Sequence, residues 1–156
     1  MLTGGQRPDC ERGSVAVFTV VFAIAVIFLT ALILDGGIAM NAKERAADIA
    51  EQAARAAADN IDVATLRSTG NAAIGPGACP LASTLVAAYA QGSHTGVDAV
   101  TSATMDTCAA PVGSDAATVQ VTITTNPLIP GVLGSFTETA QASATAECGT
   151  NQGVVC

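Results

Sequence analysis

The most prominent hydrophobic pattern in the chain is one uninterrupted apolar run near its start. Gly13 to Leu34 (GSVAVFTVVFAIAVIFLTALIL) contains no charged residue over 22 positions. As an α-helix at about 1.5 Å per residue, the run spans roughly 33 Å, enough to cross a hydrocarbon core of about 30 Å. Its polar members, Ser14, Thr19 and Thr30, can bond their hydroxyls to the preceding helical turn. We therefore expect a transmembrane helix at residues 13–34, after a short polar leader at residues 1–12.

A second helical pattern follows directly, at residues 35–59. It is dense in strong helix formers, and its apolar residues recur at spacings of three and four, which predicts one narrow apolar stripe. This alanine stripe consists of Ala46, Ile49, Ala50, Ala53, Ala54 and Ala57. Because its side chains are small, we expect it to pack closely against another helix or a sheet. The opposite face carries Glu51 and Arg55 four residues apart, a spacing that favours a solvated ion pair.

The two patterns together predict one helix from about Ser14 to Asp59, roughly 68 Å long. Gly36 and Gly37 each cost about 1 kcal/mol of helix propensity, which favours a bend where the helix leaves the membrane. Asp35 has two interpretations. It either ends the apolar run at the lipid headgroups, which we favour, or makes a polar contact within the membrane.

Residues 60–156 predict a small domain of shorter elements. Asn60 to Asp62 and Arg67 to Gly70 (RSTG) end the long helix, and the glycines and prolines up to Pro80 indicate a loop. A second helix is expected at residues 79–92 (CPLASTLVAAYAQG). Its expected apolar face consists of Leu81, Leu85, Val86, Ala88 and Tyr89.

Further along, the hydrophobic period changes from helical spacing to alternation. Residues 97–101 predict a weak strand, and residues 118–124 (TVQVTIT) predict a strong one with Val119, Val121 and Ile123 on one face. The turn-rich segment at residues 126–131 (NPLIPG) separates it from a last strand at residues 136–148. The expected fold class is therefore α+β: a helix and about three antiparallel strands leaning on the long N-terminal helix.

Charge is distributed unevenly along the chain. All six basic residues lie within the first 67 positions, and every charge beyond them is acidic. A domain without cations cannot form a phosphate-binding patch, which excludes nucleic acid as a partner. Arg7 and Arg12 before the apolar run favour a cytoplasmic N-terminus, although Lys43 and Arg45 beyond it weaken that argument.

The cysteines support the same orientation. Cys10 precedes the apolar run, and four cysteines follow it: Cys79, Cys108, Cys148 and Cys156. An even number in a small loop-rich domain indicates two disulfides formed in an oxidising compartment. Three pairings can be drawn, and we favour Cys79–Cys108 with Cys148–Cys156 because each closes a short loop. We expect a single-pass protein of the cell membrane with its C-terminal domain extracytoplasmic.

The sequence offers little chemistry for catalysis or cofactor binding. The single histidine, His94, lies in a loop-like segment, and the cysteine spacings do not suit zinc. No nucleotide-binding or nucleophile-elbow motif occurs, and Asp59 and Asp62 are better placed to cap a helix than to bind calcium. We therefore expect no enzymatic activity, no catalytic residue, no metal and no cofactor.

The first 60 residues resemble a known family. An Arg-Gly pair precedes the apolar run, an Asp and a Gly follow it, and an arginine then opens an Ala-rich stretch. The residues that carry the pattern are Arg12, Gly13, Asp35, Gly37, Arg45, Ala46, Ala47, Asp48 and Ala50. This region, about residues 11–60, resembles the TadE/TadG-like proteins of Tad (tight adherence, Flp-type) pili. The resemblance implies a structural or assembly subunit, minor-pseudopilin-like or TadG-like, that contacts other pilus or Tad-apparatus subunits at the bacterial cell surface.

One position departs from the pseudopilin pattern that the resemblance implies. Cleavage of a leader between Gly13 and Ser14 would place Phe18 at the fifth mature position, where processed pseudopilins carry Glu. We therefore expect the leader to be retained, as in a TadG-like protein anchored in the membrane.

Two alternatives of other classes remain. The first is a secreted disulfide-bonded domain with a removable signal peptide, although the apolar run exceeds the usual ~7–15-residue hydrophobic region of such peptides. The second is a membrane-anchored ligand-binding module of unrelated function. The chain has one Tyr and four Phe, so the aromatic residues that commonly line a ligand pocket are scarce.

Overall fold

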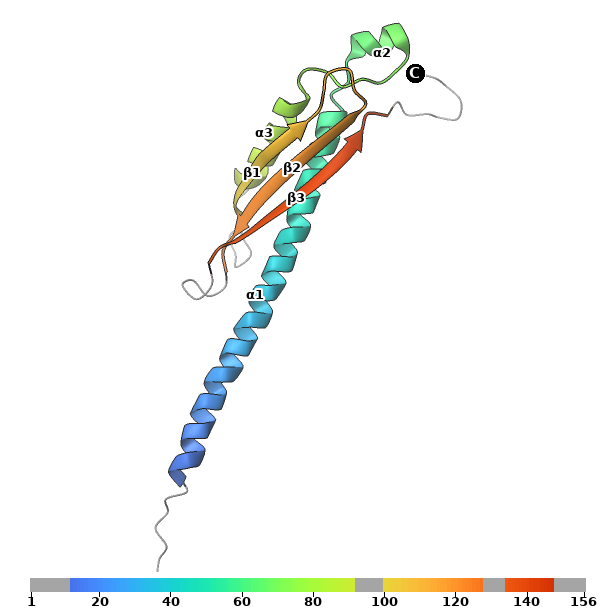
Figure 1. Ribbon diagram of the computed structural model, residues 1–156. Helices are drawn as coiled ribbons and strands as arrows, with labels where there is room; N and C mark the ends of the chain where they lie inside the picture. Colours follow the sequence, from blue (N-terminus) through green and yellow to red (C-terminus); the bar gives the residue numbers. More distant parts are fainter. Residues whose placement is uncertain (1–11, 92–99, 128–133, 148–156) are drawn as a thin grey trace, which may run out of the picture.

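The computed structural model describes residues 12–91, 100–127 and 134–147, with side chains from Val15 onward. The elements are three helices, α1 (Arg12–Ala58), α2 (Val63–Thr69) and α3 (Ala78–Gln91), and three strands, β1 (Val100–Ala109), β2 (Ala116–Thr125) and β3 (Phe136–Thr145). Figure 1 shows α1 as a long rod whose second half packs against the sheet, while its first half extends beyond the rest of the fold. The α+β class expected from the sequence is confirmed.

Helix α1 is continuous over 47 residues, roughly 70 Å. The helix passes through Asp35, Gly36 and Gly37 without interruption. The glycines where a bend was expected therefore do not divide it into two helices. The cost of two glycines is small beside the backbone hydrogen bonds that a break in the helix would expose. As expected, the hydroxyls of Thr19 and Thr30 donate to the carbonyl oxygens four residues earlier, each at 2.8 Å.

The three strands form one antiparallel sheet in the order β1-β2-β3. β2 and β3 pair in regular register over their whole length, from Ala116 opposite Thr145 to Thr125 opposite Phe136. The β1–β2 register shifts twice, once before Ser102 and once before Thr107. The expected strands at residues 118–124 and 136–148 correspond to β2 and β3, whereas the expectation of a short strand at 97–101 was wrong in extent. β1 continues to Ala109, and residues 97–99 lie outside the described residues.

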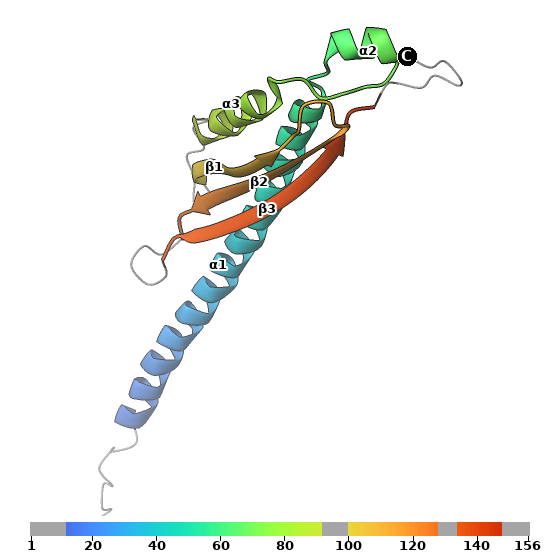
Figure 2. The same ribbon diagram turned by 45° about the horizontal axis from the view of Figure 1, so that its top comes forward.

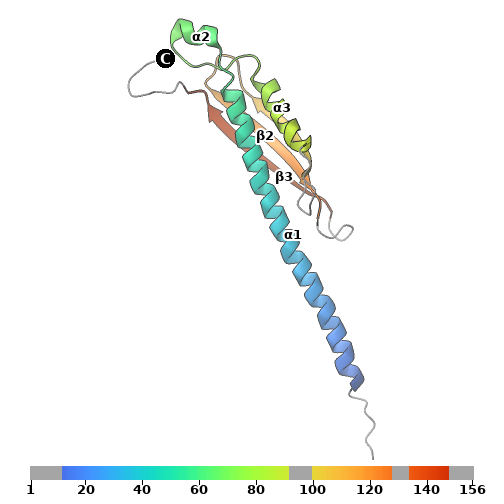
Figure 3. The ribbon, with the colours of Figure 1, turned by 180° about the vertical axis from the view of Figure 1, so that it is seen from behind.

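Both long helices lie on the same face of the sheet, α1 over β2 and β3 and α3 over β1 (Figures 2 and 3). The alanine stripe faces this interface: Ile49 is 5% exposed, and its five alanines are fully buried. Opposite them, β2 contributes Ala117, Val119, Val121, Ile123 and Thr125, none more than 1% exposed. The close packing foreseen for the stripe is thus made within the chain, and the core is thin because alanine supplies most of its helical side.

Helix α3 and helix α2 differ from the sequence expectations. In α3 the buried residues are Ala78, Ala82 and Val86, whereas Leu81 and Ala88, expected on the apolar face, are exposed. A narrow face suffices because, among the described elements, α3 packs mainly against α1 and the edge strand β1. Helix α2 was not expected at all, since its seven residues bury no side chain and so leave no apolar period.

Helix α2 depends on its caps rather than on burial. The Asp62 carboxylate accepts hydrogen bonds from the Thr65 hydroxyl at 2.7 Å and from the backbone N–H of Ala64 at 3.0 Å. These bonds, that of the Thr65 hydroxyl first, lower the pKa of Asp62 because they stabilise its charged form. Gly70 ends the helix in the left-handed conformation with φ of 74°. Asp62 therefore caps a helix, as expected, but at the start of α2.

A disulfide joins Cys79 in the first turn of α3 to Cys108 near the end of β1, with Cα atoms 5.8 Å apart. It is the first of the two pairs favoured from the sequence. Cys148 and Cys156, the second pair, lie outside the described residues.

Candidate functional site

The most unusual surface is the apolar half of α1, residues 15–34. Its Val, Ile, Leu and Phe side chains are between 43% and 75% exposed, far above what a water-soluble helix leaves uncovered. By length and composition this is the one helix in the described chain that could cross a membrane. Phe18 is 70% exposed and stacks on Phe22, with ring centroids 6.2 Å apart. The only environments that would satisfy this surface are lipid or the apolar faces of other helices.

Coverage of α1 begins at the end of the apolar half. Ala31 is 9% exposed and Asp35 is 2% exposed, while Leu34, Gly36 and Gly37 are exposed. The two buried residues lie four apart and therefore on the same face of the helix. Asp35 is thus buried within the chain, and its position relative to a membrane stays a prediction.

The outer face of the sheet, opposite the helices, is polar. Thr118 faces Ser143 and Thr122 faces Thr139 across β2 and β3, with hydroxyl oxygens 2.9 and 2.7 Å apart. The Thr122 hydroxyl also contacts the Asp106 carboxylate of β1. The hydroxyls on this face are therefore engaged with one another. Nothing in their arrangement activates a nucleophile, since no histidine or lysine contacts them among the described residues.

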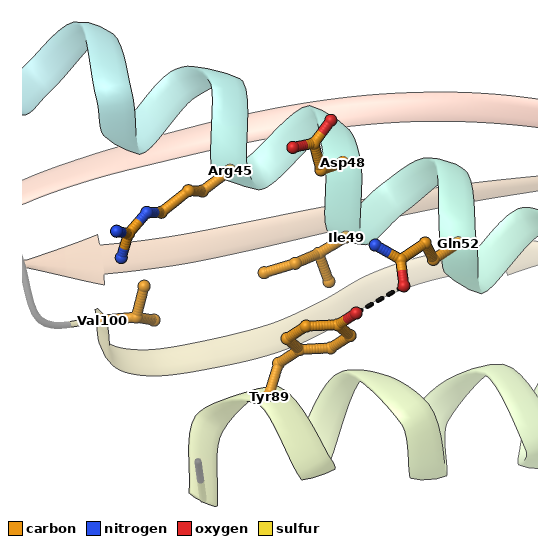
Figure 4. A pocket seen from close by; sticks show the side chains of 6 residues that line it. All are labelled: Arg45, Asp48, Ile49, Gln52, Tyr89 and Val100. Carbon is orange, nitrogen blue, oxygen red and sulfur yellow. Dashed lines mark hydrogen bonds between the residues drawn. The ribbon is translucent and has the colours of Figure 1, made fainter. Parts of the chain in front are cut away.

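A small pocket of about 210 Å³ lies between α1, α3 and the start of β1. Figure 4 shows its lining: Arg45, Asp48, Ile49 and Gln52 from α1, Tyr89 from α3, and Val100 from β1. The Tyr89 hydroxyl donates to Oε1 of Gln52 across the helix pair. The pocket is smaller than the roughly 300–1,000 Å³ of typical ligand sites, so it offers little to the ligand-binding alternative.

The other candidate positions from the sequence are scattered. Gly13 and Ser14 lie in the first turn of α1, where the side chains are not described, and His94 is outside the described residues. Within the described ranges, no group of three or more His, Cys, Asp or Glu residues is placed to hold a metal ion. The structure thus gathers the alanine stripe into one core, and among the residues it describes it brings no set of chemically reactive groups together.

Sequence reasoning missed the surface that the sheet leaves open. Apart from Phe136, the edge strand β3 carries small and polar residues with one charge, so its composition gave no signal beyond strand propensity. The signal that could have identified it is its lack of Lys, Arg and Pro, which commonly protect edge strands.

Fold and surface together define a small α+β protein carried on one long helix, half of which is apolar and uncovered. Residues 13–60 match the family model described as putative Flp pilus-assembly TadE/G-like, which confirms the resemblance found in the sequence. The matched segment is almost coextensive with α1 (Arg12–Ala58), so it includes both the apolar half and the alanine stripe. No curated protein and no solved structure matches the chain. At this level the family match supports a component of pilus assembly.

Proposed function

We propose that the protein is a structural subunit of a Tad-type pilus or secretion apparatus, anchored in the cell membrane by α1, with no catalytic role. The observation that carries the proposal is a coincidence of two features. The segment that matches the TadE/G-like family contains the apolar half of α1, and the fold leaves that half uncovered.

The energetics favour insertion of this segment in lipid. Residues 15–34 contain fourteen Val, Ile, Leu and Phe residues and no charge. At about −0.3 to −0.6 kcal/mol each, they favour a membrane-spanning helix by at most roughly 4–8 kcal/mol. Two central arginines would cost about 5–7 kcal/mol and would cancel that gain.

Membrane extraction with alkaline carbonate tests the anchor. The native protein should remain in the membrane pellet, and the double variant Ile24→Arg/Ile27→Arg should move to the soluble fraction. Met40→Arg is the matched control, because Met40 is 74% exposed on the same helix but lies beyond the apolar half. Native protein in the soluble fraction would contradict anchoring and favour the secreted alternative.

We further propose that the N-terminus is cytoplasmic and the α+β domain extracytoplasmic. Cys10 then provides a direct test, because it is the one cysteine before the apolar run. A membrane-impermeant maleimide should label Cys10 only after the cells are permeabilised. Labelling of Cys10 in intact cells would reverse the orientation.

The proposed subunit is TadG-like, with its leader retained. Phe18 supports this because it is apolar and pairs with Phe22, so it needs no charged partner within the membrane. A Glu at this position would need one. Intact-mass analysis of protein from native membranes should find residues 1–13 still attached, whereas a new terminus at Ser14 would return the chain to the processed pseudopilins.

The role in assembly is tested by deletion and complementation in the native cell. Cells without the gene should assemble fewer pili or secrete less through the apparatus. The native gene and Met40→Arg should restore assembly, while the double arginine variant should not. Normal assembly in the deleted strain would contradict the proposal.

A further inference from the structure

The two edges of the sheet differ in how they are protected. On one side, β1 shifts register twice against β2, is covered by α3 and is tied to α3 by the disulfide of Cys79 and Cys108. On the other side, β3 runs for ten residues with no register shift. Figure 1 shows β3 as the outermost strand of the sheet, and α1 packs against its helix-facing side.

Half of the backbone groups of β3 are therefore directed away from the sheet. In an antiparallel pair, alternate residues point their N–H and C=O groups away from the neighbouring strand, which gives about five of each here. Within the described ranges, β3 makes backbone hydrogen bonds only with β2. Long, regular edges are usually blocked by Lys, Pro, a bulge or an inward-pointing charge, and of these β3 (FTETAQASAT) carries only the helix-facing Glu138.

We propose that the free edge of β3 accepts an extended segment of a different protein as a fourth strand, and that this segment carries Lys or Arg. Backbone hydrogen bonds supply the affinity in such strand addition, and the alternating side chains supply the specificity. Its helix-facing residues would lie next to Ala140, Ala142 and Ala144, which are small and half-buried.

Charge complementarity indicates the chemistry of the partner. Beyond Arg67 the chain has no Lys or Arg, and the helix half that packs on the sheet carries Lys43, Arg45 and Arg55. β3 itself carries Glu138, half-buried on the helix-facing side opposite Ile123. Glu138 is near the start of β3, at the end of the sheet closer to the apolar half of α1 (Figure 1). A basic side chain on the added strand would meet Glu138 there.

A second copy of this chain fits the edge poorly. Antiparallel pairing of β3 with β3 of a second copy would point the two α1 helices in opposite directions. One membrane cannot hold both α1 helices in that arrangement. This argument rests on the proposed function, in which α1 is the membrane anchor. A second copy would also offer an acidic strand to Glu138.

Photo-cross-linking in native membranes tests the strand. A photoreactive residue is placed in turn at Thr137, Thr139, Gln141 and Ser143, which alternate along the outer face of β3. Each of these positions should cross-link to the same extended segment of another protein. The partner residue that is cross-linked should shift by two residues along that segment for each step from one β3 position to the next. Gln120 is the control, because it faces Gln141 from the central strand β2.

Three results would overturn the proposal: no adduct from β3, adducts with another copy of this chain, or adducts as strong from Gln120 as from Gln141. The last would mean that a partner covers the polar face rather than the edge.

A charge reversal tests the partner's chemistry. Glu138→Lys should lower the adduct yield at Gln141 about tenfold, because like charges that face each other cost more than the 1.4 kcal/mol of a tenfold change. Asp115→Lys changes the net charge by the same amount, but Asp115 lies in the exposed turn between β1 and β2. The adduct yield at Gln141 in this variant should therefore stay within about twofold of the yield without the charge change. Both variants should retain the Cys79–Cys108 disulfide, which reports folding. Equal yields in the two variants would overturn the basic partner.

Carbonate extraction of the same samples separates this proposal from the previous one. Protein that stays in the membrane but lacks the ordered series of β3 adducts (the adduct ladder) would overturn the added strand alone. Protein that leaves the membrane but keeps the ladder would overturn the anchor and leave the added strand in place.

Discussion

Enlarging one side chain of the alanine stripe should loosen the whole domain. Ala53 is fully buried on α1, in the core cluster that includes Val119 and Val121 of β2. Ala53→Leu adds three carbon atoms where the helix and sheet approach closely, and overpacking of this kind typically costs 1–3 kcal/mol. In a domain of 60–100 residues each kcal/mol lowers Tm by about 4–8 °C, so we expect a fall between about 4 and 24 °C.

The assay is the temperature at which the domain becomes sensitive to a protease, measured on the full chain in membranes. A protease of broad specificity is required, because residues 68–156 contain no Lys or Arg for trypsin. Ala47→Leu is the matched control, since Ala47 is exposed on the same helix. Gln52 would be a poor control because it accepts the hydrogen bond of Tyr89. Equal melting of the two leucine variants would refute the assignment of the stripe to the core.

Three further predictions concern the disulfide, the cap of α2 and two glycines. Replacing Cys79 and Cys108 by Ser should destabilise the domain by about 3–4 kcal/mol, the loop-closure entropy for a separation of 29 residues, as measured by the same protease assay. The pKa of Asp62 is lowered in the folded state, so the stabilisation by its cap should be complete above the ordinary carboxyl pKa and lost as pH falls through the lowered pKa. An NMR titration of the α2 amides would follow this loss, and amide shifts that do not change with pH would contradict it. Gly75→Ala should destabilise, since its Cβ would lie 2.9 Å from the side chain of Asn60, whereas Gly36→Ala meets no atom within 4 Å and should raise helix stability by about 1 kcal/mol; equal melting of these two variants would contradict the contact.

The elements with strong local patterns were predicted from the sequence. α1 was expected from about Ser14 to Asp59 and runs from Arg12 to Ala58, because both its apolar run and its alanine stripe repeat at the helical period. β2 was expected from the alternation of Val119, Val121 and Ile123, and all three are buried on one face. In both cases one element has two chemically different faces, and that difference is visible without knowing what covers them.

The weaker elements depended on contacts that a local pattern cannot show. β1 alternates poorly because its two register shifts move residues from one face of the strand to the other, so only its first residues were expected. Helix α2 buries nothing and depends on the cap at Asp62. In α3, the residues that face the core are Ala78, Ala82 and Val86, and Leu81 lies outside this face with 46% of its surface exposed.

The sequence by itself determined the long apolar helix, the acidic character of residues 68–156 and the α+β class, because each depends on composition and period along a single segment. Only the tertiary structure decided that the alanine stripe packs on the chain's own sheet, since close packing of small residues suits an internal sheet and an external helix equally well. It also decided that β3 is an edge strand, paired only with β2 within the described ranges, and that Asp35 is buried. These two features depend on which segments lie side by side, and strand order and coverage are set by contacts between residues far apart in the sequence.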